Sequence, residues 1–203
     1  MRTKAALTAL TVLALAFCGC GAVPQSKYYQ LQVPAQTSPA ATGDPLPVVL
    51  LVGLLKGSHL YREDRLVYAT ETEQMGTYQE HRWAAPPTEM LRDMLWRTLQ
   101  TSHRYSAVHL LSSGAHGDYI LEGNLYDFKE VSGSRLLARL NLELDLRDTK
   151  TGAVVWTRDC SHDEPVTGKD VPAVVAALDR NAHRCMGIVQ ASLSDYFAAQ
   201  GKK

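Results

Sequence analysis

The chain has 203 residues, and its 21 Lys and Arg residues balance 21 Asp and Glu residues. This zero formal charge, without a basic stripe, argues against a nucleic-acid partner. Hydrophobic residues make up 45% of the chain, which is enough for one well-packed core. After the N-terminal apolar run no second long one follows, so we expect no later membrane span.

The N-terminal segment, residues 1–19, has the pattern of a secretory signal. A basic start leads into a mostly apolar run that is too short to span a bilayer and ends at Phe17. Bacterial lipoprotein signals end in an apolar residue, two small residues and an acylated cysteine. This pattern predicts Cys20 as the lipid-bearing residue, and Cys18 fits less well because bulky Phe17 precedes it. The alternatives are an ordinary cleaved signal and a metal or redox pair of cysteines.

Proline, Ala, Ser and Thr dominate residues 20–46, which predicts a lipidated tether. Within it, "KYYQLQ" (27–32) is a short segment with aromatic and apolar side chains that can pack on a protein surface. We expect its Tyr28 and Tyr29 to lie on the surface of the domain. Residues 47–200 then form the folded domain.

The first half of the domain is predicted to contain three strands and one helix, at 48–55, 65–70, 77–84 and 88–102. The strand at 48–55 is apolar on both of its faces. Its outer face therefore needs a cover. The candidates are the "KYYQLQ" segment, a second copy of the chain, a hydrophobic partner, or another part of the same domain.

The second half is predicted to contain strands at 106–111, 118–131, 136–147 and 153–160, and a helix at 171–199. Apolar and polar residues alternate strictly over 136–147, as in a strand with one buried face. Together these elements predict an α+β fold, a two-layer sandwich with a mostly antiparallel sheet and two main helices packed on one face.

Two cysteines remain in the exported part, Cys160 and Cys185. An oxidising compartment favours a disulfide between them, with two free thiols as the alternative. A zinc site with His162 and His183 is a third possibility. It is disfavoured because His183 and Cys185 lie about 200° apart on a helix. We therefore expect no metal.

Sequence motifs of catalysis are absent: the chain has no G-x-S-x-G, no H-E-x-x-H and no glycine-rich phosphate loop. The run His162, Asp163 and Glu164 has the character of a solvated turn. We expect neither an enzyme nor a cofactor. Arg82 and Trp83 form a candidate anchoring pair, although Trp83 before a helix is also typical of a core residue.

Several stretches resemble one family. "YYQL", "LYREDRLVYATETEQ", "HRWAAPPTEMLRDML", "DYILEGNLYDF" and "TGAVVW" are similar to the ABC-type transport auxiliary lipoproteins, the group of the paraquat-inducible lipoprotein PqiC. The resemblance covers roughly residues 28–198. Its most specific parts are the Tyr-Tyr-x-Leu start and the Arg-Trp-Ala-x-Pro entry to the first helix.

The resemblance implies an outer-membrane lipoprotein that faces the periplasm. A homo-oligomer is a separate expectation, because a second copy of the chain could cover the apolar outer face of the strand at 48–55. The partners of the lipoprotein would be an ABC permease and an MCE-domain substrate-binding protein, in a system that moves phospholipid or other hydrophobic molecules between membranes. Its role would be docking or channel completion, with Tyr28, Tyr29, Arg82 and Trp83 as candidate partner-binding residues. The alternatives are a lipoprotein that activates a cell-wall synthase or assists a surface-polymer machine, and a periplasmic hydrolase.

Overall fold

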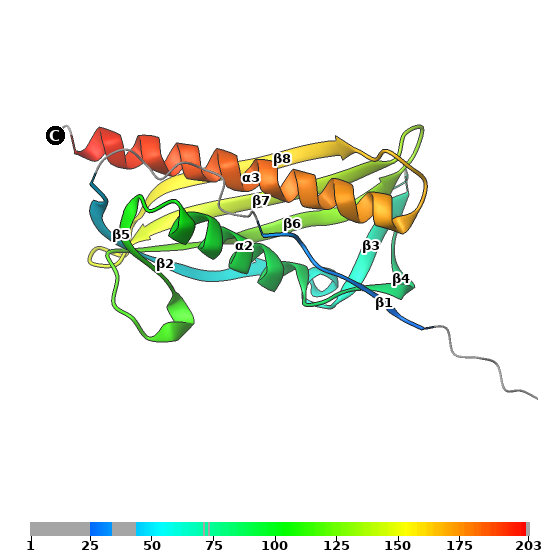
Figure 1. Ribbon diagram of the computed structural model, residues 1–203, viewed down its shortest axis with the longest axis horizontal. Helices are drawn as coiled ribbons and strands as arrows, with labels where there is room; N and C mark the ends of the chain where they lie inside the picture. The colour runs from blue at the N-terminus through cyan, green and yellow to red at the C-terminus, as the bar shows by residue number, and fades with distance from the viewer. Residues whose placement is uncertain (1–24, 34–43, 71, 73, 202–203) are drawn as a thin grey trace, which may run out of the picture.

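The computed structural model describes residues 25–33, 44–70, 72 and 74–201 (Figure 1). All the predicted strands and both predicted helices are present within these residues. In chain order the elements are β1 (Lys27–Tyr29), β2 (Leu46–Gly57), η1 (His59–Tyr61), β3 (Arg65–Thr70), β4 (Met75–Trp83), α2 (Pro87–Thr101), β5 (Tyr105–Leu110), η2 (Leu111–Ser113), β6 (Tyr119–Ser132), β7 (Leu137–Asp148), β8 (Val154–Pro165) and α3 (Val171–Gln200).

The strands form one sheet with β6 near its centre. The order is β1-β4-β3-β6-β2-β5, and β7 and β8 continue from β6 on a separate branch. The two longest pairings, β6 with β7 and β7 with β8, are antiparallel. β2 runs parallel to both β5 and β6. The chain between β2 and β5 includes β3, β4 and α2, which is long enough for the crossover that a parallel pair needs. The predicted α+β sandwich is confirmed, with a sheet of mixed direction.

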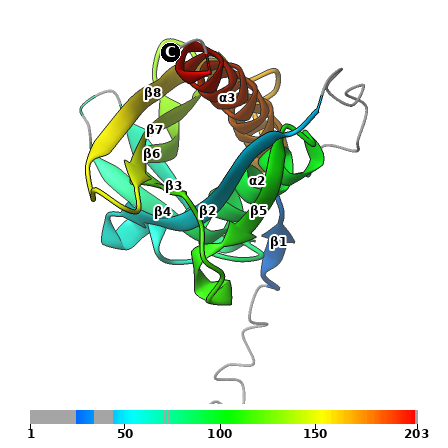
Figure 2. The ribbon, with the colours of Figure 1, turned by 90° about the vertical axis from the view of Figure 1, so that its left-hand side faces the viewer.

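Both helices pack on one face of the sheet, which curls around them when the molecule is viewed end-on (Figure 2). α3 lies along β7 and β8, and α2 lies along β2 and β5. The inward-facing residues of β7 are fully buried, which confirms the alternation predicted for this strand. They are Ala138, Leu140, Leu142, Leu144 and Leu146.

Strand β8 is longer than the sequence indicated. The polar run 161–164, which we expected to form a turn, continues β8, because each of its residues pairs with a residue of β7. Val154 and Trp156, two residues apart at the start of β8, differ in burial. A register shift between Leu146 and Arg147 leaves Val154 45% exposed, whereas the indole N–H of Trp156 donates to Ser192 of α3.

The outer face of β2 is covered partly from within the chain. Leu51 is 3% exposed, and a Cβ at Gly117 would lie 2.6 Å from its Cγ, so the backbone before β6 lies directly against Leu51. Leu54, by contrast, is 67% exposed. The two-sided apolar strand therefore needs no partner at Leu51 and presents an uncovered leucine at Leu54. Among the described helices, neither is long and apolar enough to cross a membrane.

Candidate partner-binding site

The four residues predicted to bind a partner lie on two neighbouring strands at one edge of the sheet. β1 pairs in parallel with β4, so that Tyr28 lies opposite Arg82 and Tyr29 lies opposite Trp83. The main-chain N–H of Ala84 extends this pairing by donating to the carbonyl of Tyr29 at 2.6 Å. The fold thus brings together two motifs that lie far apart in the sequence.

Tyr29 is held by β4 through its side chain as well as its backbone. Its hydroxyl lies 2.8 Å from Nδ1 of His81, and the two rings stack with their centroids 5.7 Å apart. Desolvation by burial, and then the negative charge of Asp170, raise the pKa of Tyr29. Its phenol therefore stays neutral, and its hydrogen bond with His81 holds β1 against β4.

The other three residues differ in how far they reach the surface. Tyr28 is 64% exposed. The guanidinium of Arg82 donates to Asp64 at 2.8 Å and is only partly exposed. Trp83 is 1% exposed and packs on Phe128 with ring centroids 5.3 Å apart, as a core residue does. Tyr28 and Arg82 are therefore the members of this group that another molecule can reach.

Residues 27–32, which we call the N-terminal strap, bind the domain at two further points that sequence reasoning missed. Leu31 is buried in the core, and the main-chain N–H of Gln32 donates to Oδ1 of Asp179 in α3 at 2.7 Å. A cavity of about 110 Å³ lies beside the strap, with Leu31, Met90 and Arg97 in its wall. The apolar Leu31 inside a polar segment is the sequence signal that could have indicated this docking.

A larger hollow of about 330 Å³ opens between the end of β2 and the start of α2. Exposed Leu54 lines it together with the cationic Lys56, Arg62 and Arg92, and Glu89 contributes one carboxylate. These residues come from β2, the loop before β3 and α2, so no local motif marks the hollow in the sequence.

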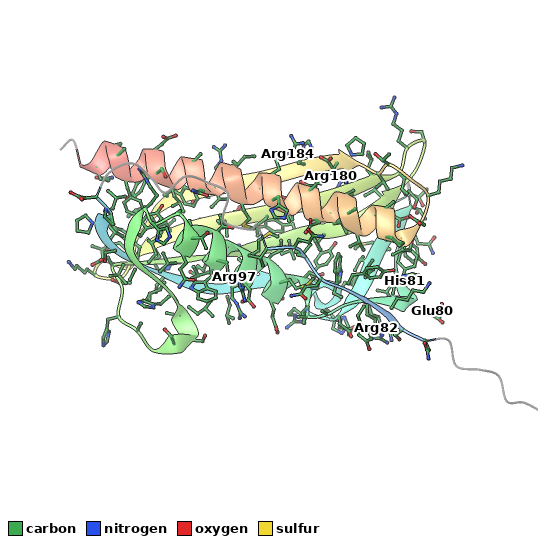
Figure 3. The ribbon with its side chains drawn as sticks, in the orientation of Figure 1. Glu80, His81, Arg82, Arg97, Arg180 and Arg184 are labelled. Carbon is green, nitrogen blue, oxygen red and sulfur yellow. A yellow bond between two sulfur atoms is a disulfide. The ribbon has the colours of Figure 1, made fainter. Side chains whose placement is uncertain are left out.

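Residues 162–164, which we expected to form a solvated turn, make ion pairs that link β8 to neighbouring elements. Glu164 contacts Arg180 and Arg184 of α3 at 3.2 Å each, and Nε2 of His162 lies 3.4 Å from it (Figure 3). Burial pushes the pKa of Glu164 up, but the hydrogen bond from Arg180 and the charges of both arginines outweigh it, so the net pKa is lowered.

Asp163 makes the matching contact on the outer face of the sheet. The guanidinium of Arg139 donates two hydrogen bonds to it, at 2.8 and 2.9 Å. This bidentate pair is the largest cause of a lowered pKa at Asp163. Both carboxylates therefore serve the packing of β7, β8 and α3, and neither has the raised pKa of a general acid.

Cys160 and Cys185 are joined by a disulfide with their Cα atoms 5.7 Å apart, which links β8 to α3. Nε2 of His183 lies near Asp179, at 3.6 Å, and His162 faces Glu164. Within the described part of the chain no group of three or more His, Cys, Asp or Glu side chains could hold a metal ion. Cys20 lies outside the described residues.

Comparison with known proteins gives one family match. The model of the ABC-type transport auxiliary lipoprotein component matches residues 29–186. The crystal structure of protein XCC0632 from Xanthomonas campestris, of family model DUF330, is similar with a TM-score of 0.75 and 21% identity, over 87% of this chain and 100% of that one.

A second crystal structure, of an uncharacterized protein, has a TM-score of 0.66 and 16% identity, over 83% of this chain and 99% of that one. At these identities the two structures show a shared fold. The search of curated proteins found no match.

Proposed function

The chain belongs to the family of ABC-type transport auxiliary lipoprotein components, and from this membership we propose that it is the outer-membrane member of an MCE-type transport system. In this proposal residues 1–19 are the signal, Cys20 carries the lipid, residues 20–46 link it to the domain, and residues 47–200 form that domain. The family is one of transport auxiliaries and not of enzymes.

The proposed role is to dock an MCE-domain substrate-binding protein, and through it an ABC permease, at the outer membrane. Phospholipid or another hydrophobic molecule would then pass between the membranes. The observation that carries this proposal is the family match, which starts at Tyr29 within the strap and extends through most of the domain.

The test is co-purification from membranes of the full-length, tagged protein, with the bound proteins identified by mass spectrometry. We expect an MCE-domain protein and an ABC permease. Recovery of a cell-wall synthase or a polymer-export protein in their place would overturn the proposal. A Tyr28→Ser variant and a matched Tyr126→Ser variant, at another exposed tyrosine, would show whether the β1–β4 edge contributes to this protein contact; equal recovery of the partners with both variants would leave the edge free for another surface.

A further inference from the structure

The docking of the N-terminal strap shortens the link between the domain and its lipid anchor. If all of residues 20–46 were free, that link could extend about 90 Å. However, residues 27–32 are fixed at both ends. β1 pairs with β4, and Gln32 is bound to Asp179 of α3. Only residues 21–26 then lie between Cys20 and Lys27, and they reach about 25 Å when fully extended.

A reach of about 25 Å is shorter than the domain itself. α3 alone has 30 residues and is therefore about 45 Å long. In Figure 1, β1 lies at the end of the molecule where α3 begins, and the C-terminus lies at the opposite end. A lipid attached through so short a link restricts how the domain can turn, so the end far from β1 cannot face the bilayer.

We infer that the β1–β4 edge of the domain rests on the surface of the bilayer, so that the opposite end points away from it. This inference rests on the acylation of Cys20 proposed above. The edge has the chemistry of an interfacial contact. Tyr28 is 64% exposed, and tyrosine favours the headgroup level, where its ring is shielded and its hydroxyl stays in water. Exposed Lys27 beside it suits anionic headgroups.

The edge also has no strand beyond it. Among the described residues β1 pairs with β4 alone, so its outer side is free to lie against a flat surface. By contrast, the far end carries the segment 111–118 and the turn after β7, and it would project away from the bilayer.

The experiment uses the full-length acylated protein in vesicles of phosphatidylethanolamine and phosphatidylglycerol that contain a headgroup-linked quencher. One variant carries a fluorophore at Lys27→Cys and the control carries it at Ser112→Cys, in the exposed segment at the far end. The native thiols do not compete, because Cys18 leaves with the signal, Cys20 is acylated, and Cys160 and Cys185 are joined. We expect quenching at position 27 to exceed that at position 112 several-fold.

A flexible insertion of 20 Gly and Ser residues between Ser26 and Lys27 should bring quenching at position 27 down toward that at position 112. Equal quenching at the two positions without the insertion would overturn the orientation while leaving the anchoring intact. Vesicles that retain no protein after a salt wash would overturn the acylation of Cys20 and this inference together. The co-purification experiment is read separately, so a failed partner assignment remains distinguishable from either result.

Discussion

The main-chain N–H of Gln32 donates a hydrogen bond of 2.7 Å to Oδ1 of Asp179, 147 residues later in the chain. This bond fastens the N-terminal strap to the terminal helix. It ties the part of the chain nearest Cys20 to the helix that also carries Cys185. The position of the strap therefore depends on the folded domain as a whole.

Replacing Asp179 with Ala should loosen the strap. A hydrogen bond to a charged group contributes about 1.5–3 kcal/mol, so protection of the Gln32 and Ala84 amides from hydrogen exchange should fall by about tenfold or more. The Asp195→Ala variant, at an exposed position of the same helix, should leave this protection unchanged. Unaltered exchange in the Asp179→Ala protein would show that Leu31 and β1 hold the strap without this bond.

Lipidation is expected at Cys20. The Cys20→Ser variant should lose fatty-acid labelling and leave the membrane fraction, because the attached acyl chains provide the anchor. The Cys18→Ser variant is the matched control and should keep both properties. Labelling that persists in Cys20→Ser and disappears in Cys18→Ser would assign the lipid to Cys18.

Removing the disulfide should destabilise the domain without changing its fold. The bridge has a sequence separation of 25, and closing a loop of this size contributes on the order of 3 kcal/mol in the chain-entropy model. The Cys160→Ala/Cys185→Ala protein should therefore unfold at lower urea concentration. Reductant should destabilise the natural protein and have no effect on this variant. A natural protein that is alkylated at both thiols without reductant would contradict the bond.

Acid should weaken the attachment of β8 to its neighbours. The pKa values of Asp163 and Glu164 are lowered from 3.8 and 4.5 by their arginine partners. A lowered pKa in the folded state stabilises the protein above the ordinary pKa, and this contribution is lost as the pH falls through the folded-state value. The melting temperature should therefore decline below about pH 4.5.

The Asp163→Asn variant should show a shallower decline, because one of the two linked protons is no longer taken up. Asp195→Asn, at an exposed position, serves as the control. A melting temperature that rises on acidification over this range would contradict the assignment.

Two glycines should respond oppositely to alanine. A Cβ at Gly123 would collide with the carbonyl oxygen of Glu143 in the neighbouring strand, whereas a Cβ at Gly187, within α3, would meet no atom within 4 Å. Gly187→Ala should stabilise the protein by about 0.5–1 kcal/mol through the lower entropy of the unfolded chain. Gly123→Ala should destabilise it by several times that amount. Urea unfolding of both variants measures this difference, and effects of the same sign would contradict it.

The sequence by itself determined most of the elements and the family. The strict alternation over β7 and the apolar stripe of α3 each identify the face of the element that is buried. Such a pattern lies within one segment, so it can be recognised without the rest of the chain. The two remaining cysteines and the predicted export signal likewise indicated a disulfide, because redox compartment and cysteine number are both inferred from the sequence.

Only the tertiary structure decided where the strap goes. Three residues of β1 carry no periodic signal of their own, and their pairing with β4 depends on a neighbour strand far along the chain. The same reason explains why "SHDE" was mistaken for a turn: its polar residues continue β8 because β7 supplies partners and Arg139, Arg180 and Arg184 supply charges. Long-range pairing decides such segments, since their local propensity is too weak to decide them.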